Sequence, residues 1–223
     1  MKQVFFVLLS LVITNGAWAQ GITKNGKVTT TGTEYVNKNG AIGTSFGVNK
    51  NGEIVASVVP LAVGDSIQGG KIAYFFVDGD PGYVAGEVHG LIAASADLII
   101  NNNWGCSSID IVGTVSGVGH GNANTILITN GCATAGIPAR ECADLTLNGY
   151  SDWYLPSIDE LNILITNKDL IGGFVSPGSY WSSSQQLSGF LFYQNAYYIY
   201  TGDNSVNTGP KGNKFRVRPV RSF

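Results

Sequence analysis

The most direct candidates for catalysis are three consecutive serines, Ser182, Ser183 and Ser184, because a serine hydroxyl can act as a nucleophile. A serine nucleophile needs an adjacent general base within hydrogen-bond reach. The chain contains two histidines, His89 in a turn-like segment and His120 in a glycine-rich one, and neither lies near the serines in sequence. The pattern therefore favours a protein that is not an enzyme.

Two short acidic segments, Asp78-Gly79-Asp80 and Asp203-Asn204, could bind a hard cation such as calcium, since their side chains supply oxygen ligands. The same residue types also form ordinary turns, and we favour that interpretation. Zinc has less support, because the histidines are isolated and the chain contains no CxxC pair. We predict no metal cofactor, with calcium as the alternative.

The three cysteines allow one disulfide and leave one thiol over. Cys142 lies in a helical pattern that begins at Pro138, and it is most simply a small buried residue. The preferred bridge is therefore Cys106–Cys132. The alternative is a metal site, for which the sequence offers too few ligands.

Tyrosines near the end of the chain could serve recognition. In a strand, alternation places Tyr198 and Tyr200 on one face, and Tyr197 and Ile199 on the other. The side chains on one face therefore pack into the core, and those on the other face are exposed to solvent and available to a ligand. Exposed tyrosines give rigid contact area together with a hydroxyl group.

Basic residues follow these tyrosines, and arginine in particular suits bidentate contact with sulfate or carboxylate. We expect Arg218 and Arg221 to hold the last strand to Asp152 or Asp159 inside the fold, which leaves the other basic residues as surface candidates. The candidate ligand-binding residues are Gln185, Gln186, Tyr193, Tyr198, Tyr200, Asp203, Asn204, Lys211, Lys214 and Arg216.

The element that positions this region begins at Ser157. Ser157 and Glu160 have the spacing of a capping box in front of an apolar helical stripe. Before it, residues 153–155 predict a short buried strand that Pro156 ends. Asn148-Gly149 is expected to form a left-handed C-cap for a preceding helix.

The remaining segments give an α+β pattern. Helices are expected over residues 122–130, from Pro138 onward and over residues 157–167. In the first of these, Ala123, Ile126 and Leu127 are expected on the buried face. Strands are expected over residues 71–77, 89–94, 180–184, 192–200, 205–208 and 215–220. Trp104, Trp153 and Trp181 are expected in the core.

The N-terminal part predicts export. Residues 1–19 have the form of a signal peptide, with one lysine, a short apolar run and the sequence Ala17-Trp18-Ala19 at the cleavage site. Residues 20–61 contain three Lys-Asn-Gly turns and predict a β-turn-rich spacer or stalk, and residues 62–223 predict one compact domain. The net charge of −2 excludes a general nucleic-acid-binding footprint. No further apolar run is long enough to span a membrane.

Several spaced motifs of residues 62–223 resemble the C-terminal domain family of the Legionella collagen-like adhesin. The matching segments are Gly69-Gly70-Lys71-Ile72, Trp104-Gly105-Cys106, Asn124-Thr125, the run from Asn148 to Ser157 with Glu160-Leu161, Tyr180-Trp181-Ser182-Ser183, Ala196-Tyr197-Tyr198 and the run from Val217 to Arg221. The resemblance implies a C-type-lectin-like domain with two main helices and short antiparallel sheets.

The resemblance also implies a function. Such domains are extracellular recognition modules, in some members adhesins for sulfated polysaccharides, and their C-terminal loops and short strands present the binding face. We therefore expect a secreted or cell-surface module that binds a glycan or a surface protein. The alternative is a structural subunit of a surface assembly, joined through residues 21–59. Formylglycine-generating enzymes share a related fold but need cysteines late in the domain, and none follows Cys142 here.

Overall fold

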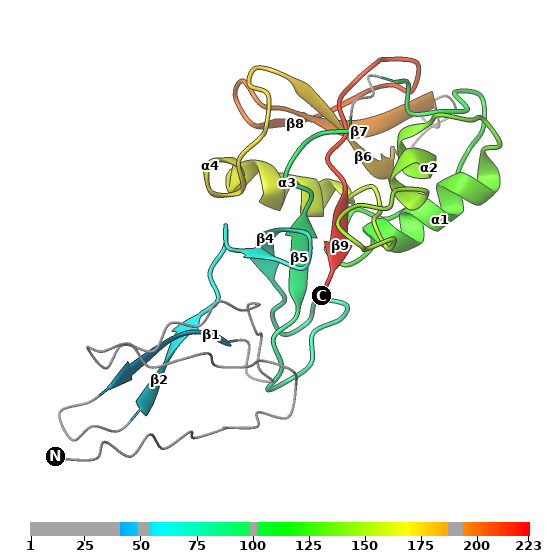
Figure 1. Ribbon diagram of the computed structural model, residues 1–223. Helices are drawn as coiled ribbons and strands as arrows, with labels where there is room; N and C mark the ends of the chain where they lie inside the picture. The colour runs from blue at the N-terminus through cyan, green and yellow to red at the C-terminus, as the bar shows by residue number, and fades with distance from the viewer. Residues whose placement is uncertain (1–40, 49–53, 99–101, 187–193) are drawn as a thin grey trace, which may run out of the picture. The chain divides into compact units, whose positions relative to one another are not determined.

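The computed structural model describes residues 41–48, 54–98, 102–186 and 194–223 (Figure 1). The contacts between Cα atoms divide the chain into two units, Met1–Leu61 and Ala62–Phe223. The predicted signal peptide, the three Lys-Asn-Gly turns and Tyr193 lie outside the described residues.

The described part of the first unit is a β-hairpin. Strand β1 (Ala41–Val48) pairs antiparallel with β2 (Ile54–Pro60). The register runs from Ala41 opposite Pro60 to Val48 opposite Ile54, with one shift between Gly43 and Ser45.

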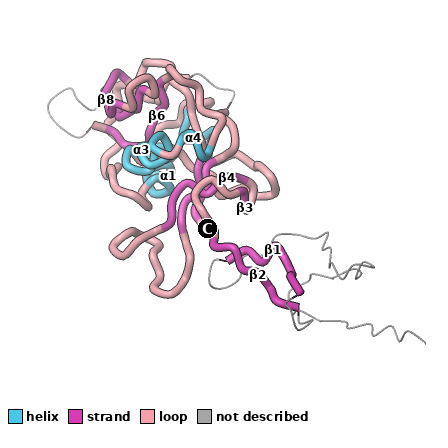
Figure 2. Tube along the Cα trace, turned by 90° about the vertical axis from the view of Figure 1, so that its left-hand side faces the viewer, coloured by secondary structure: helices cyan, strands magenta, loops and turns pink. Residues whose placement is uncertain are grey.

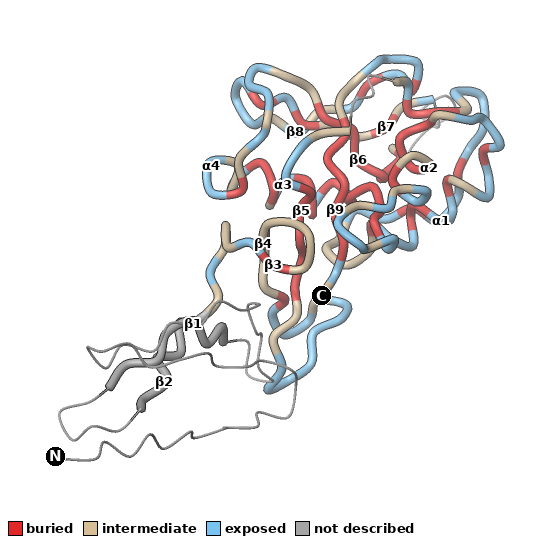
Figure 3. Tube along the Cα trace, in the orientation of Figure 1, coloured by how far each residue is buried: buried red, intermediate tan, exposed pale blue. Residues whose placement is uncertain are grey.

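The described residues of the second unit form two antiparallel sheets. The first has the order β3-β4-β5-β9, with β3 at Ser66–Ile67, β4 at Gly70–Phe75, β5 at Gly90–Ala93 and β9 at Val220–Ser222. The second has the order β6-β7-β8, with β6 at Ser179–Gln185, β7 at Asn195–Tyr200 and β8 at Ser205–Pro210. The long exposed connection between β4 and β5 extends away from the rest of the unit (Figure 3).

The described helices are α1 (Gly121–Gly131), α2 (Pro138–Ala143), α3 (Ile158–Thr166) and α4 (Lys168–Ile171). The predicted capping box is confirmed, because the Ser157 hydroxyl accepts from the Glu160 N–H and the Glu160 carboxylate accepts from the Ser157 N–H. Pro138 occupies the first turn of α2, as its lack of an N–H favours. The mixed α+β class predicted from the sequence is thus present.

Helix α3 lies between the two sheets, so both sides of its apolar surface are covered (Figures 1 and 2). Leu164 packs with Leu91 and Val220 of the first sheet. Leu161 packs with Ile199 of the second sheet. The predicted apolar stripe of this helix is therefore buried, and burying side chains of this size stabilises the fold by about 1.5–3 kcal/mol each.

The predicted tryptophan core is confirmed, since Trp104, Trp153 and Trp181 are all buried. Trp104 and Trp181 belong to the cluster that packs against α1 and α2, and each donates its indole N–H to a backbone carbonyl. These bonds satisfy the one polar atom that each ring carries into the interior.

Three local predictions are wrong. The strand expected over residues 215–220 begins only at Val220, where β9 starts. Asn148 and Gly149, with φ of 53° and 84°, form the tight turn between Leu147 and Tyr150, which exchange two backbone hydrogen bonds, and α2 already ends at Ala143. The predicted face of α1 is also reversed, because Ile126 and Leu127 are exposed while Asn124 is buried. Asn124 is drawn inward because its side chain accepts from the Val115 N–H and donates to the Val115 carbonyl.

Candidate functional site

Three aromatic rings from separate segments meet at one face of the second sheet. Trp181 of β6 lies directly opposite Tyr198 of β7, and Phe215 follows β8. The Phe215 ring centroid is 4.4 Å from that of Trp181 and 4.5 Å from that of Tyr198. Trp181 is fully buried, whereas Tyr198 and Phe215 are half-buried. We call these three residues the aromatic platform.

The platform is held by the backbone beneath it. Phe215 forms an isolated β-bridge with Asn102, and the backbone N–H of Trp181 donates to the backbone carbonyl of Arg216. The ring of Tyr198 lies against Gly209, where a Cβ atom would be 3.1 Å from the Tyr198 Cε1. Glycine at this position therefore lets the tyrosine ring lie flat on the neighbouring strand.

Polar groups surround the half-exposed rings. A Cβ at Gly209 would lie 3.2 Å from the Asn213 amide nitrogen, which places Asn213 beside Tyr198. Lys214 directly precedes Phe215 and is exposed. Asn207 lies opposite Tyr198 on β8. The sequence pointed to Tyr198 and Lys214 but not to Phe215, Asn207 or Asn213; the one available signal for Phe215 was an aromatic residue within a basic run.

A second group of candidate residues lies at the β7–β8 turn. Tyr200 is 39% exposed. The Asp203 carboxylate accepts from the Ser205 N–H, and hydrogen bonding to Ser205 lowers the pKa of this exposed carboxyl. Asn204 has a φ of 60° and accepts a hydrogen bond from Lys168 at 2.7 Å. Asp203 and Asn204 thus serve the turn itself, while Tyr200 is displayed.

The prediction that Lys211 lies on the surface is wrong, and Gln185, a candidate ligand-binding residue, is buried beside it. Lys211 is fully buried and Gln185 nearly so, because each is drawn inward by polar groups of the 109–111 segment. The Lys211 ammonium donates to the Ile109 carbonyl and to the Gln185 side-chain oxygen. Burial lowers the pKa of Lys211 to about 8. Gln186 is half-buried and bonds to Asn195 through both backbone and side chain.

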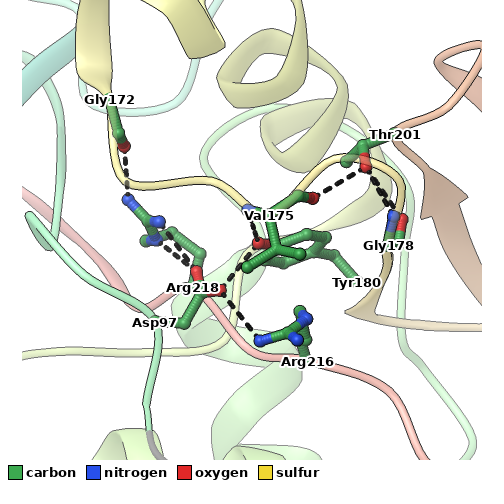
Figure 4. A network of polar contacts seen from close by, with 8 residues as sticks. All are labelled: Asp97, Gly172, Val175, Gly178, Tyr180, Thr201, Arg216 and Arg218. Atoms are coloured by element: carbon green, nitrogen blue, oxygen red, sulfur yellow. Dashed lines mark hydrogen bonds and ion pairs between the residues drawn. The ribbon is translucent and has the colours of Figure 1, made fainter.

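Arg216 belongs to a different surface from the aromatic platform, although it is the next residue after Phe215. Its guanidinium lies 3.8 Å from Asp97, on the side where Tyr180 and Arg218 point (Figure 4). Successive residues of an extended chain point to opposite sides. The candidate residues therefore divide into the platform edge, the β7–β8 turn and the surroundings of Asp97.

Asp97 is the centre of an internal set of contacts (Figure 4). The fully buried Arg218 contacts Asp97 at 2.7 Å, and the Tyr180 hydroxyl donates to Asp97 at the same distance. Arg218 also donates to the carbonyls of Ala94 and Gly172. Burial, with the bond to Asp97, raises the pKa of Tyr180 to about 12.

The prediction that Arg218 and Arg221 hold the last strand to acidic residues inside the fold is confirmed, but the predicted partner of Arg218 is wrong. Arg221 makes two hydrogen bonds to Asp152, at 2.6 Å and 2.8 Å, as expected. Arg218 pairs with Asp97 rather than with Asp152 or Asp159. The guanidinium group of Arg218 also lies 3.9 Å from the ring centroid of Phe174. Both arginines are internal, so neither adds charge to a recognition surface.

The three candidate serine nucleophiles are engaged in internal contacts. The Ser182 hydroxyl donates to the Tyr197 carbonyl. The Ser184 hydroxyl donates to the Val115 carbonyl and accepts from the Ile158 N–H. Each hydroxyl thereby fixes a neighbouring segment of backbone, which accounts for the run of serines structurally.

The other reactive side chains also have structural partners. Ser183 accepts from the Asn124 amide. His89 contacts Glu87 and the Phe223 carbonyl, and the bond to Glu87 raises the pKa of His89. Cys142 is a buried free thiol, and burial raises its pKa, so the reactive thiolate is disfavoured.

The predicted disulfide between Cys106 and Cys132 is confirmed. For the acidic segments, Asp80 accepts hydrogen bonds from the Tyr74 hydroxyl and the Val77 N–H and donates its backbone N–H to the Val77 carbonyl, so it closes the turn that begins at Val77. Among the described residues there is no group of three or more His, Cys, Asp or Glu residues that could hold a metal ion.

One segment of the chain matches a known sequence family. This segment contains the aromatic platform, Arg218 and the capping box of α3. Residues 121–221 match the Lcl C-terminal domain family. This match confirms the resemblance read from the sequence motifs, over α1 to β9. It leaves β3, β4, β5 and Cys106 outside the matched segment. A comparison with curated proteins finds no match.

The family match and the internal disulfide fit an extracellular protein, since disulfides persist mainly in oxidising compartments. Across the described part of the chain, no helix is long and apolar enough to cross a membrane.

Proposed function

We propose that this chain is an exported, non-catalytic binding module whose C-type-lectin-like domain recognises an acidic polysaccharide at the aromatic platform. One observation carries the proposal: the half-exposed rings of Tyr198 and Phe215 are fixed against buried Trp181, with Lys214 exposed beside them. A fixed aromatic face offers stacking area without an ordering cost, and an adjacent ammonium attracts carboxylate or sulfate.

Three further observations support a binding rather than a catalytic role. The serine hydroxyls of β6 are used internally, the free thiol is buried, and His89 is held by Glu87 and a backbone carbonyl. The resemblance of the chain to a family that includes adhesins for sulfated polysaccharides agrees with the exposed ammonium of Lys214 beside the platform. A surface protein is the other partner class that such a platform suits.

A second candidate, a structural subunit of a surface assembly, is favoured by a different surface. Val112 is 73% exposed and Ile126 is 52% exposed, and the side chain of Leu127, the residue after Ile126, lies against Gly113, the residue after Val112. Apolar residues exposed together mark a contact surface more often than scattered ones do.

Binding of the purified chain to heparin and to an uncharged polysaccharide tests the first proposal. We expect heparin binding that weakens about five- to tenfold in Lys214→Gln and in Phe215→Leu, because one removes the charge and the other the ring. Lys71→Gln is the matched control, since Lys71 lies on β4 in the other sheet. Equal affinity in all four proteins, or no binding to any glycan on an array, would reject the platform as a glycan site.

A further inference from the structure

The buried ammonium of Lys211 contacts the Gln185 carboxamide and the Ile109 carbonyl, and this carboxamide in turn contacts a carboxylate and a backbone N–H. Its Nζ is 2.6 Å from the Gln185 Oε1. The Gln185 Oε1 also accepts the Ile111 N–H at 2.9 Å, and its Nε2 contacts the Asp110 carboxylate. Gln185 ends β6, Lys211 follows β8, and the other residues lie in the loop before α1. The tertiary fold alone brings these groups together.

The cluster has the parts that acyl transfer to an amine requires. The amine is Lys211 Nζ, and the acyl carbon is Gln185 Cδ, one C=O bond length (about 1.2 Å) from the oxygen that Nζ already contacts. The Ile111 N–H points at the oxygen on which negative charge would develop. The Asp110 carboxylate contacts the nitrogen that would leave, which is the place for a proton carrier.

The surroundings exclude water from the reacting atoms. Lys211 is fully buried, Gln185 is 2% exposed, and Trp104 covers the ammonium at 4.5 Å from its ring centroid. Exclusion of water favours aminolysis over hydrolysis of the carboxamide.

We propose that Lys211 and Gln185 form an intramolecular isopeptide bond. The neutral amine of Lys211 attacks Cδ of Gln185, the Nζ–Cδ bond forms, and the Cδ–Nε2 bond breaks. Nζ loses one proton and Nε2, which Asp110 contacts, gains one, so the amide nitrogen leaves as ammonia. No atom is oxidised or reduced and no co-reactant is needed, so the fold itself completes the reaction.

The protonation state of Lys211 sets the speed of the reaction. Burial lowers the pKa of Lys211 to about 8, which provides neutral amine near neutral pH, while Asp110 is the facing charge that acts against this shift. The Trp104 ring also favours the ammonium form through its π-face. The bond should therefore form faster as the pH rises from 6 towards 9.

Intact-mass measurement of the purified full chain tests the proposal. We expect a mass lower by one ammonia than the sequence with its disulfide predicts. Ammonia can also be lost from an N-terminal glutamine, so Lys211→Met is the matched control, and it should retain only that other loss. Asp110→Asn should fold with the same circular dichroism spectrum and acquire the bond at least tenfold more slowly.

Peptide mapping locates the bond. Trypsin should not cleave after Lys211, and chymotrypsin, which cuts at the tyrosines between the two positions, should release a branched peptide containing Gln185 and Lys211. A folded wild-type chain that is cleaved normally after Lys211 following prolonged incubation at pH 9 would overturn the proposal. So would a branched peptide that maps to other residues.

Discussion

At the scale of single residues, Glu160 is the most consequential buried group of the domain. Its two oxygens accept the N–H groups of Gly119 and Ser157, and it lies against Gly121 at the start of α1. One carboxylate thereby holds the chain where two helices begin, at the N-cap of α3 and just before the N-cap of α1. Burial raises the pKa of Glu160 to about 7, although these hydrogen bonds act to lower it.

Replacement of Glu160 by Gln should lower the free energy of unfolding by about 2 kcal/mol at pH 8, because an amide NH₂ replaces one acceptor opposite a buried N–H. The folded pKa of about 7 is above the usual 4.5, so protonation favours the folded state. The contribution of this group is full below pH 4.5 and is lost as the pH rises through 7.

Urea unfolding of both proteins between pH 4.5 and pH 8 measures this dependence. Asp152 works in the opposite direction, since hydrogen bonding to Arg221 lowers its pKa, but it is common to both proteins and cancels in the difference. A stability difference that does not change with pH would show that Glu160 titrates normally in the folded state.

At the scale of elements, α1 buries two polar residues together with Ile128, while two of its apolar residues are exposed. Asn124 and Thr125 are buried because they satisfy backbone groups of Val115 and Leu155. Residues 107–120 have little regular structure, so their backbone groups need side-chain partners. The helix therefore uses its polar residues to fix a loop and leaves Ile126 and Leu127 exposed.

Asn124→Ala should cost about 2–3 kcal/mol, because it leaves the N–H and carbonyl of Val115 without their partners. Leu127→Gln on the outer face should change the free energy of unfolding by less than about 0.5 kcal/mol. Thermal unfolding of the two variants compares the faces directly. A larger loss for Leu127→Gln than for Asn124→Ala would mean that the outer face is covered in solution.

The sequence predicts α3 well and α1 poorly, and the difference is physical. Ser157, Glu160 and the apolar stripe act within one helix, so they can be read locally. The orientation of α1 depends on Val115 and Leu155, which only the fold brings near. Lys211 fails as a surface prediction for the same reason, since its partner Gln185 lies 26 positions away. The sequence predicted only part of the aromatic platform. Tyr198 can be identified from the alternation of residues within its strand, whereas Phe215 lies in a separate segment that only the tertiary fold brings near.

At the scale of the whole molecule, the contacts of Asp97 and Arg218 join four parts of the second unit. Asp97 follows β5, Gly172 ends α4, Tyr180 belongs to β6, and Arg218 precedes β9. The ion pair is buried, so its loss exposes an unpaired charge to a low-dielectric interior. Both sheets therefore depend on one carboxylate.

Asp97→Asn should destabilise the domain by about 3–5 kcal/mol, because Arg218 remains buried without its counter-charge. The exposed Lys214→Gln should remain within about 0.5 kcal/mol of the wild type. Chemical denaturation followed by tryptophan fluorescence measures both. Equal stability of Asp97→Asn and wild type would contradict the central role of this pair.

The segment from Phe215 to Phe223 touches nearly every earlier part of the second unit: it pairs with β5, with Tyr154 and with Asn102, and it carries Arg218 and Arg221. Without this segment, β5 lacks a neighbour on one side and Asp97 lacks its counter-ion. The cluster around Cys132, which is fully buried in the folded domain, is also incomplete until Phe215 and Val217 pack against it. We therefore expect Cys132 to be oxidised more easily before this segment docks than after it.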